Sequence, residues 1–121
     1  MSMKKVLIVD DSLVDQANLE VIVSDAGCLP ITASSAREAI EMAQAERPDL
    51  IFLDVIMPEQ DGFATCRVLS KNDATRHIPV VFTTSKNQKV DRIWGQMQGG
   101  KAYITKPFTP DDIVTQIEAL A

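Results

Sequence analysis

The sequence has 121 residues, of which 45% are hydrophobic and 24% are charged, enough for one domain over residues 1–121 that buries a core without disulfides or a structural metal. We expect no separate output domain within this length. The net charge of −5 argues against a nucleic-acid-binding protein, and no apolar run is long enough for membrane insertion.

The first apolar run covers residues 6–9 and ends at two adjacent carboxylates, Asp10 and Asp11. A short continuous apolar run is typical of a parallel strand that is buried on both faces. Two lysines precede it, but the carboxylates follow too soon for the core of a signal peptide, and no small-residue cleavage site follows them. We therefore expect a buried first strand in a cytoplasmic protein.

Four further strands are predicted at residues 29–33, 50–53, 80–82 and 103–104. Pro30 has no N–H for a sheet ladder, so the strand over 29–33 is expected at an edge. A final helix is predicted from about Pro110 to the chain end, behind the N-cap Thr109. Three other segments have apolar residues at helical spacing, and each stripe is predicted to face the core: Leu19, Ile22, Val23 and Ala26; Ala36, Ala39, Ile40 and Ala43; Val90, Ile93, Trp94 and Met97.

This alternation of strands and helices predicts an α/β fold, a doubly wound five-stranded parallel sheet of the flavodoxin-like type. Right-handed crossovers leave two strand orders open, and an edge position for the proline strand favours 2-1-3-4-5. Ligands bind such sheets beyond the carboxyl ends of the strands, where the strand order reverses. Asp10, Asp11 and Asp54, which ends the third strand, are all expected at that point.

Three converging carboxylates repel one another unless a cation neutralises them. Oxygen donors without clustered His or Cys favour Mg²⁺, or alternatively Mn²⁺, and Mg²⁺ also seeks phosphate oxygens. Asp54 can supply a nucleophile for phosphoryl chemistry, while Thr84 and Lys106 bring a hydroxyl and an ammonium to the same edge of the sheet. The pattern therefore indicates a phosphoryl-transfer site.

Four segments resemble, in order and spacing, the receiver domains of two-component response regulators: VDDS at 9–12, LDVIMPEQDG at 53–62, TTS at 83–85 and YITKPF at 103–108. The resemblance covers essentially the whole chain. It implies that Asp54 accepts a phosphoryl group from a histidine kinase or phosphotransfer domain. It also implies that Asp10 and Asp11 position Mg²⁺ and that the backbone carbonyl of Ile56 completes the metal shell.

The same resemblance implies a switch. Thr84 binds the phosphoryl oxygens, Lys106 pairs with them, the Lys106–Pro107 peptide bond is cis, and Tyr103 is an aromatic that turns inward when Thr84 moves. A downstream output protein would then bind the surface of the fourth helix, fifth strand and fifth helix. Such a domain is not an enzyme beyond its own phosphorylation and dephosphorylation. Pro58 and Gly62 are expected to bracket a turn after Asp54.

A narrower resemblance concerns residues 83–100, which are similar to the corresponding part of stand-alone regulators of type IV pilus twitching motility. The shared features include a tryptophan in the fourth helix, here Trp94. This resemblance implies a role in twitching-motility or chemotaxis-like control. Two residues beyond Asp54, the side chain of Ile56 offers no polar group to orient an attacking water. We therefore expect slow self-dephosphorylation.

Three other functions fit parts of the pattern. A pseudo-receiver that docks without phosphorylation would share every feature of the fold. A flavodoxin-like cofactor binder is disfavoured because Asp10 and Asp11 would repel its phosphate. An aspartyl phosphatase of the haloacid dehalogenase type has a motif resembling DxDGT, and here Ile56 stands where the second acid belongs.

Overall fold

The computed structural model describes residues 3–121, so residues 1 and 2 of the expected domain lie outside the described part. Over that range, no helix has the length and apolar character needed to cross a membrane. Strands and helices alternate along the chain with these bounds: β1 Lys5–Val9, α1 Leu13–Asp25, β2 Leu29–Ala33, α2 Ala36–Glu46, β3 Leu50–Leu53, α3 Gly62–Lys71, β4 Val80–Thr84, α4 Lys89–Met97, β5 Ala102–Thr105 and α5 Pro110–Leu120.

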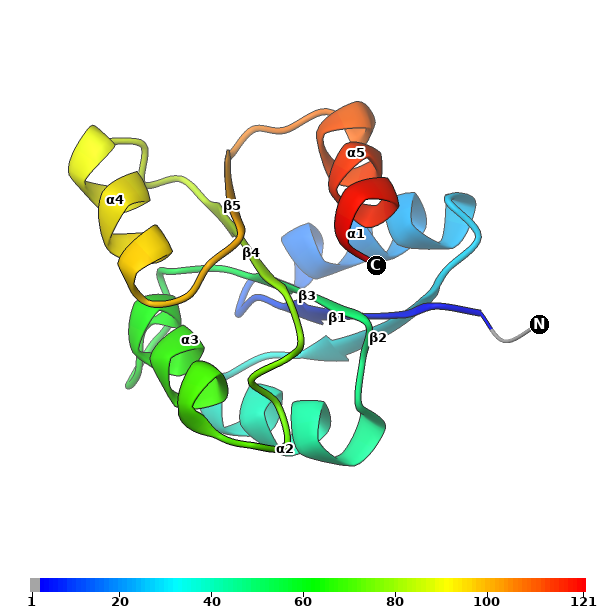
Figure 1. Cartoon of the computed structure of the whole chain (residues 1–121). Helices are drawn as coiled ribbons and strands as arrows, with labels where there is room; N and C mark the ends of the chain where they lie inside the picture. The colour runs from blue at the N-terminus through cyan, green and yellow to red at the C-terminus, as the bar shows by residue number, and fades with distance from the viewer. Residues whose placement is uncertain (1–2) are drawn as a thin grey trace.

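The strands form one parallel sheet in the order β2-β1-β3-β4-β5, which confirms the predicted doubly wound α/β fold. The proline strand β2 lies at an edge, where Pro30 is paired with Val6 of β1. Figure 1 shows α1 and α5 together on one side of the sheet and α2 and α3 on the other. The carboxyl ends of β1 and β3, which are neighbours in the sheet, therefore lie between two helical layers.

Each face of the sheet is covered by its own apolar cluster, as alternation of side chains along the strands requires. One cluster packs β1, β3 and β4 against α1 and α5, and includes Ile8, Phe52, Val81, Leu19 and Ile113. The other packs them against α2 and α3, and includes Leu7, Leu53, Phe82, Ala39 and Phe63. The predicted core stripes of α1 and α2 are confirmed except at Ala26, which is exposed because α1 ends at Asp25 and Ala26 caps it.

The alternation of strands and helices implies a helix between β3 and β4, but no sequence pattern located α3, because Pro58 and Gly62 indicated only a turn. It begins behind the N-cap Asp61, whose carboxylate accepts a hydrogen bond of 2.8 Å from the backbone N–H of Ala64. Its buried face includes Phe63, Cys66 and Leu69, which are spaced by three residues. This stripe is short and has polar neighbours, so the helical signal of the pattern is weak here.

The apolar stripe of α4 faces solvent, and the prediction that it faces the core is wrong. The exposed fractions of Val90, Ile93, Trp94 and Met97 are 63%, 47%, 44% and 68%. The helix turns Gly95 toward the sheet instead, where an added Cβ would lie 3.0 Å from the ring of Phe82. Close backbone packing on that side leaves the four large apolar side chains on the opposite, outer side.

Candidate functional site

Two of the predicted site carboxylates directly follow the neighbouring strands β1 and β3. Asp10 is fully buried and Asp54 is 6% exposed, while Asp11 is an exposed residue. One carboxylate oxygen from each of the three residues lies within 4.8 Å of the others. The structure therefore brings together the acidic cluster that the sequence predicted.

Lys106 follows β5 and extends its ammonium into this cluster. Its Nζ donates to Asp10 Oδ2 at 2.8 Å and to Asp54 Oδ2 at 3.2 Å. A third bond, of 2.8 Å, goes to Asp15 Oδ2 in the first turn of α1. Sequence reasoning missed Asp15. The available signal was its position three residues after the N-cap Ser12, which places it in the first turn of the helix, next to the strand ends.

The remaining oxygens of the two buried carboxylates are held by backbone amides. Asp10 Oδ1 accepts from the N–H of Ser12 at 2.9 Å, and Asp54 Oδ1 accepts from the N–H of Ile56 at 3.1 Å. Gln16 is buried and its side-chain amide donates to the carbonyl oxygen of Asp10 and to the hydroxyl of Ser34. Both Oδ2 atoms are therefore directed toward Lys106.

The charges in the cluster shift two pKa values. Burial raises the pKa of Asp10, and the nearby charge of Asp54 raises it further. The hydrogen bonds from Lys106 and Ser12 lower this pKa, but the net shift is upward. Burial lowers the pKa of Lys106, but its bonds to Asp10 and Asp15 and the charge of Asp54 outweigh burial, so the net shift is upward. The ammonium thus stays charged and acts as the counterion of the acidic cluster.

Thr84 and Tyr103 lie beside the cluster and are linked through Lys86. Thr84 ends β4 with a fully buried side chain, and its Oγ1 accepts from the N–H of Lys86 at 3.4 Å. The hydroxyl of Tyr103 donates to the carbonyl oxygen of Lys86 at 2.8 Å. Within residues 3–121 neither side chain hydrogen-bonds to Asp10, Asp54 or Lys106. The Lys106–Pro107 peptide bond is cis, as the resemblance implied.

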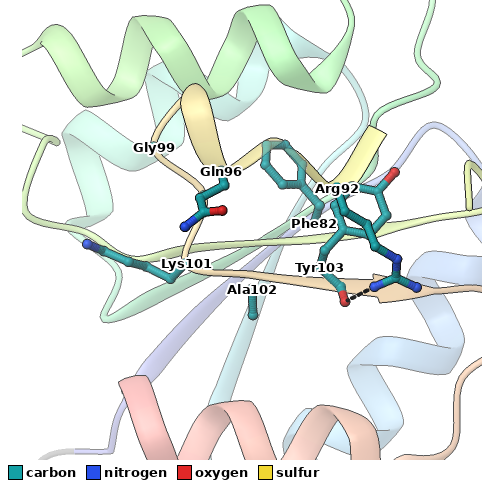
Figure 2. A pocket seen from close by; sticks show the side chains of 8 residues that line it. Phe82, Arg92, Gln96, Gly99, Lys101, Ala102 and Tyr103 are labelled. Atoms are coloured by element: carbon teal, nitrogen blue, oxygen red, sulfur yellow. Dashed lines mark hydrogen bonds between the residues drawn. The ribbon is translucent and has the colours of Figure 1, made fainter. Parts of the chain in front are cut away.

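Arg92 of α4 holds the strand that carries Tyr103. Its guanidinium donates to Thr105 Oγ1 at 2.7 Å and to the carbonyl oxygen of Tyr103 at 3.4 Å. Figure 2 shows Arg92 reaching from α4 to this carbonyl, beside a hollow of about 490 Å³ between α4 and β5. No feature of the sequence pattern had singled out Arg92, because its partners lie on a different element, the strand β5.

The residues present fit a hard divalent cation. Asp10, Asp11 and Asp54 offer only carboxylate oxygens, the donors that Mg²⁺ and Mn²⁺ prefer. Burial and the neighbouring charge of Asp54 both raise the pKa of Asp10, which is the effect that a bound cation would relieve. The cluster could therefore hold a metal ion. Whether the Ile56 carbonyl adds a ligand stays a prediction.

A doubly wound parallel sheet that presents acids after its first and third strands, and a lysine after its fifth, defines the class of protein. Residues 6–118 match the family described as the response regulator receiver domain. The chain belongs to the response regulator receiver domain family. Receiver domains are signalling domains that work with histidine kinases and downstream effectors.

The chain is similar to several known proteins over nearly its whole length. The chain is 34% identical to Protein PilH of Pseudomonas aeruginosa over 118 residues, covering 98% of both chains. It is 33% identical to Protein PilG of the same organism, covering 95% of this chain and 85% of that protein. The solved structure of chemotaxis protein CheY4 of Vibrio cholerae has a TM-score of 0.93 at 29% identity, with 99% of this chain and 100% of that chain covered.

Proposed function

We propose that this chain is a phosphorylation-controlled binding module in which Asp54 accepts a phosphoryl group from a histidine kinase or a phosphotransfer domain. The observation that carries the proposal is the position of Asp54. The residue is 6% exposed, its carboxylate lies in the acidic cluster, and the Lys106 ammonium lies 3.2 Å from Oδ2. A carboxylate nucleophile with a fixed cation beside it suits phosphoryl transfer.

In the proposed step, the Asp54 carboxylate attacks the phosphorus of a phosphohistidine. A P–O bond forms, the P–N bond breaks, and the leaving imidazole nitrogen keeps the electron pair. Asp10, Asp11, Asp54 and the Ile56 carbonyl would hold Mg²⁺ or Mn²⁺, which supplies neutralisation of the phosphoryl oxygens when bound. Lys106 would pair with one of those oxygens, and the Thr84 hydroxyl would bind another.

We infer that the output surface includes α4, β5 and α5. Thr84 and Tyr103 both contact Lys86, so a shift of the Thr84 hydroxyl toward a phosphoryl oxygen would alter the loop that leads into α4. The α4 stripe of Val90, Ile93, Trp94 and Met97 is exposed next to this loop. Exposed apolar side chains gathered on one helix face suit a protein-binding surface.

The pathway we propose is twitching-motility or chemotaxis-like control. The similarity of residues 83–100 to pilus regulators supports it, as does the match to PilH and PilG along nearly the whole chain. In this proposal the chain acts as one receiver domain in the cytoplasm. Its output is then contact with another protein.

The test is intact mass after incubation with Mg²⁺ and acetyl phosphate. We expect wild type to gain one phosphoryl group and Asp54→Asn to gain none. Asp73→Asn is the matched control, because Asp73 is exposed and its ion pair with Arg76 lies away from the cluster. A phosphoryl group on the Asp54→Asn variant would contradict Asp54 as the acceptor. Absence of gain in wild type, also with a phosphorylated kinase, would favour the docking-only pseudo-receiver.

A further inference from the structure

Lys106 has one partner that lies outside the candidate metal cluster. Within residues 3–121 the ammonium has three ion pairs, of which two go to Asp10 and Asp54 and the third goes to Asp15 Oδ2 at 2.8 Å. The Asp15 side chain is 40% exposed, whereas those of Asp10 and Asp54 are 0% and 8% exposed. The ammonium therefore lies at the border between the buried cluster and the surface.

A divalent cation in the cluster would compete with Lys106 for the same atoms. Lys106 occupies Oδ2 of both Asp10 and Asp54, and backbone amides occupy the Oδ1 atoms. A cation bound to these two carboxylates would also repel the ammonium. Cation binding therefore favours movement of Lys106 away from these atoms, and within residues 3–121 Asp15 is the acid outside the cluster that its ammonium already contacts.

The surroundings of Asp15 leave room for this movement. A hollow of about 290 Å³ opens beside the lysine and is lined by Asp15, Asn18, Lys106, Pro107 and Phe108. The backbone of Asp15 is fixed in the first turn of α1, where its N–H donates to Ser12 Oγ at 3.3 Å. The acceptor is thus anchored, while the ammonium has space on its outer side.

We propose that Asp15 is a positioning residue, which receives the Lys106 ammonium when a divalent cation takes the carboxylates of Asp10 and Asp54. The inference rests on the proposed function, because it assumes the cation site. Asp15 lowers the penalty for displacing the lysine and keeps the ammonium within reach of a phosphoryl group on Asp54. Without Asp15, the lysine would stay on the cluster and oppose the cation.

The test is calorimetric titration with Mg²⁺ of wild type, Asp15→Asn, Lys106→Met and the double variant. We expect Asp15→Asn to weaken Mg²⁺ binding in the presence of Lys106 by at least about threefold more than it does in the Lys106→Met background. A loss of the Asp15 charge alone, or of its contribution to the start of α1, would act equally in both backgrounds. Equal losses, or no loss in either background, would overturn the proposal.

A crystal structure with Mg²⁺ bound gives a second measurement. We expect Lys106 Nζ to keep its bond to Asp15 and to lose its bonds to Asp10 and Asp54. A lysine that leaves Asp15 but stays on Asp10 would overturn the proposal and leave the cation site intact. Wild type that binds no Mg²⁺ at all would instead remove the metal part of the proposed function, and this inference with it.

Discussion

The guanidinium of Arg92 lies over the ring of Tyr103, with its central carbon 5.2 Å from the ring centroid. The same guanidinium bonds the backbone of Tyr103 and the hydroxyl of Thr105, so one side chain ties α4 to β5. The hydroxyl of Tyr103 is in turn held by its hydrogen bond to the carbonyl oxygen of Lys86. The ring of Tyr103 packs on the ring of Phe82, with 5.9 Å between the ring centroids. The position of the proposed switch aromatic therefore depends on α4.

A double-mutant cycle of Arg92→Met and Tyr103→Leu measures this contact. We expect a coupling of about 0.5–1 kcal/mol in the free energy of unfolding, the size of an exposed cation–π pair. The control cycle pairs Tyr103→Leu with Arg37→Met, since Arg37 bonds Glu41 on α2. In the control cycle, the two changes in the free energy of unfolding should be additive. Zero coupling between Arg92 and Tyr103 in urea unfolding would contradict the contact.

Gly62 is predicted to be necessary for the position of Asp54. An added Cβ would lie 2.1 Å from the carbonyl oxygen of Asp54 and 2.8 Å from Val55 Cα, so the backbone must shift. We expect Gly62→Ala to lower the free energy of unfolding by roughly 1–3 kcal/mol. We also expect slower phosphorylation, because Asp54 moves relative to Lys106.

Gly27→Asn is the control for that experiment. Gly27 has a φ of +83°, and nothing lies within 4 Å of an added Cβ. Asparagine tolerates the left-handed conformation better than other side chains. The substitution should leave the phosphorylation rate unchanged, and a Gly62→Ala protein with wild-type stability and rate would contradict the role of the close approach.

Cys66 predicts a pH dependence of stability. Its buried thiol donates to the carbonyl oxygen of Gln98 at 3.4 Å, and burial raises its pKa from 9.0 to about 11. The folded state then binds this proton more tightly than the unfolded state. The resulting stabilisation is complete below the unfolded pKa and is lost as the pH rises from about 9 to about 11.

Urea unfolding as a function of pH tests this sign. Relative to Cys66→Ala, wild type should lose roughly 1–3 kcal/mol of unfolding free energy across that range. Cys28→Ala serves as the comparison, because Cys28 is also a buried free cysteine. If the pH profiles of wild type and Cys66→Ala run parallel, the proposed linkage is wrong.

Ile56 is predicted to prolong the phosphorylated state. The residue is 53% exposed beside the site, and its side chain has no group that could orient an attacking water. We expect Ile56→Asn to shorten the phosphoryl lifetime by about tenfold. Val68→Asn, on the exposed surface of α3, should have no effect. A wild-type half-life of only seconds, measured by intact mass, would contradict slow self-dephosphorylation.

The strand ends and the acidic cluster were predictable from local patterns, whereas two strand orders stayed open and only an edge position for Pro30 favoured one of them. A carboxylate after an apolar run marks the end of a buried strand, and Pro30 indicates an edge. The roles of Asp15 and Arg92 were not predictable in this way. Asp15 meets Lys106 across 91 positions of sequence, so only the folded chain shows that they are partners.

The α4 stripe shows a second limit of sequence patterns. Helical spacing of Val90, Ile93 and Met97 correctly indicated a helix with one apolar face. Spacing does not say what that face contacts, and here Gly95 packs on the sheet because its lack of a side chain allows close approach to Phe82. For α4 the helix was found and its contacts were wrong, whereas for α3 the helix itself was not located. The short apolar stripe of α3 was too weak to distinguish a helix from a turn.

The most direct test of the central claim is to locate the phosphoryl group by borohydride reduction. Reduction of an aspartyl phosphate converts that residue to homoserine, which peptide mass spectrometry can place in the sequence. After reaction with acetyl phosphate and Mg²⁺, we predict homoserine at position 54 and at no other aspartate. Homoserine at Asp10, Asp11 or Asp15, or a phosphorylated protein that yields none, would contradict Asp54 as the acceptor.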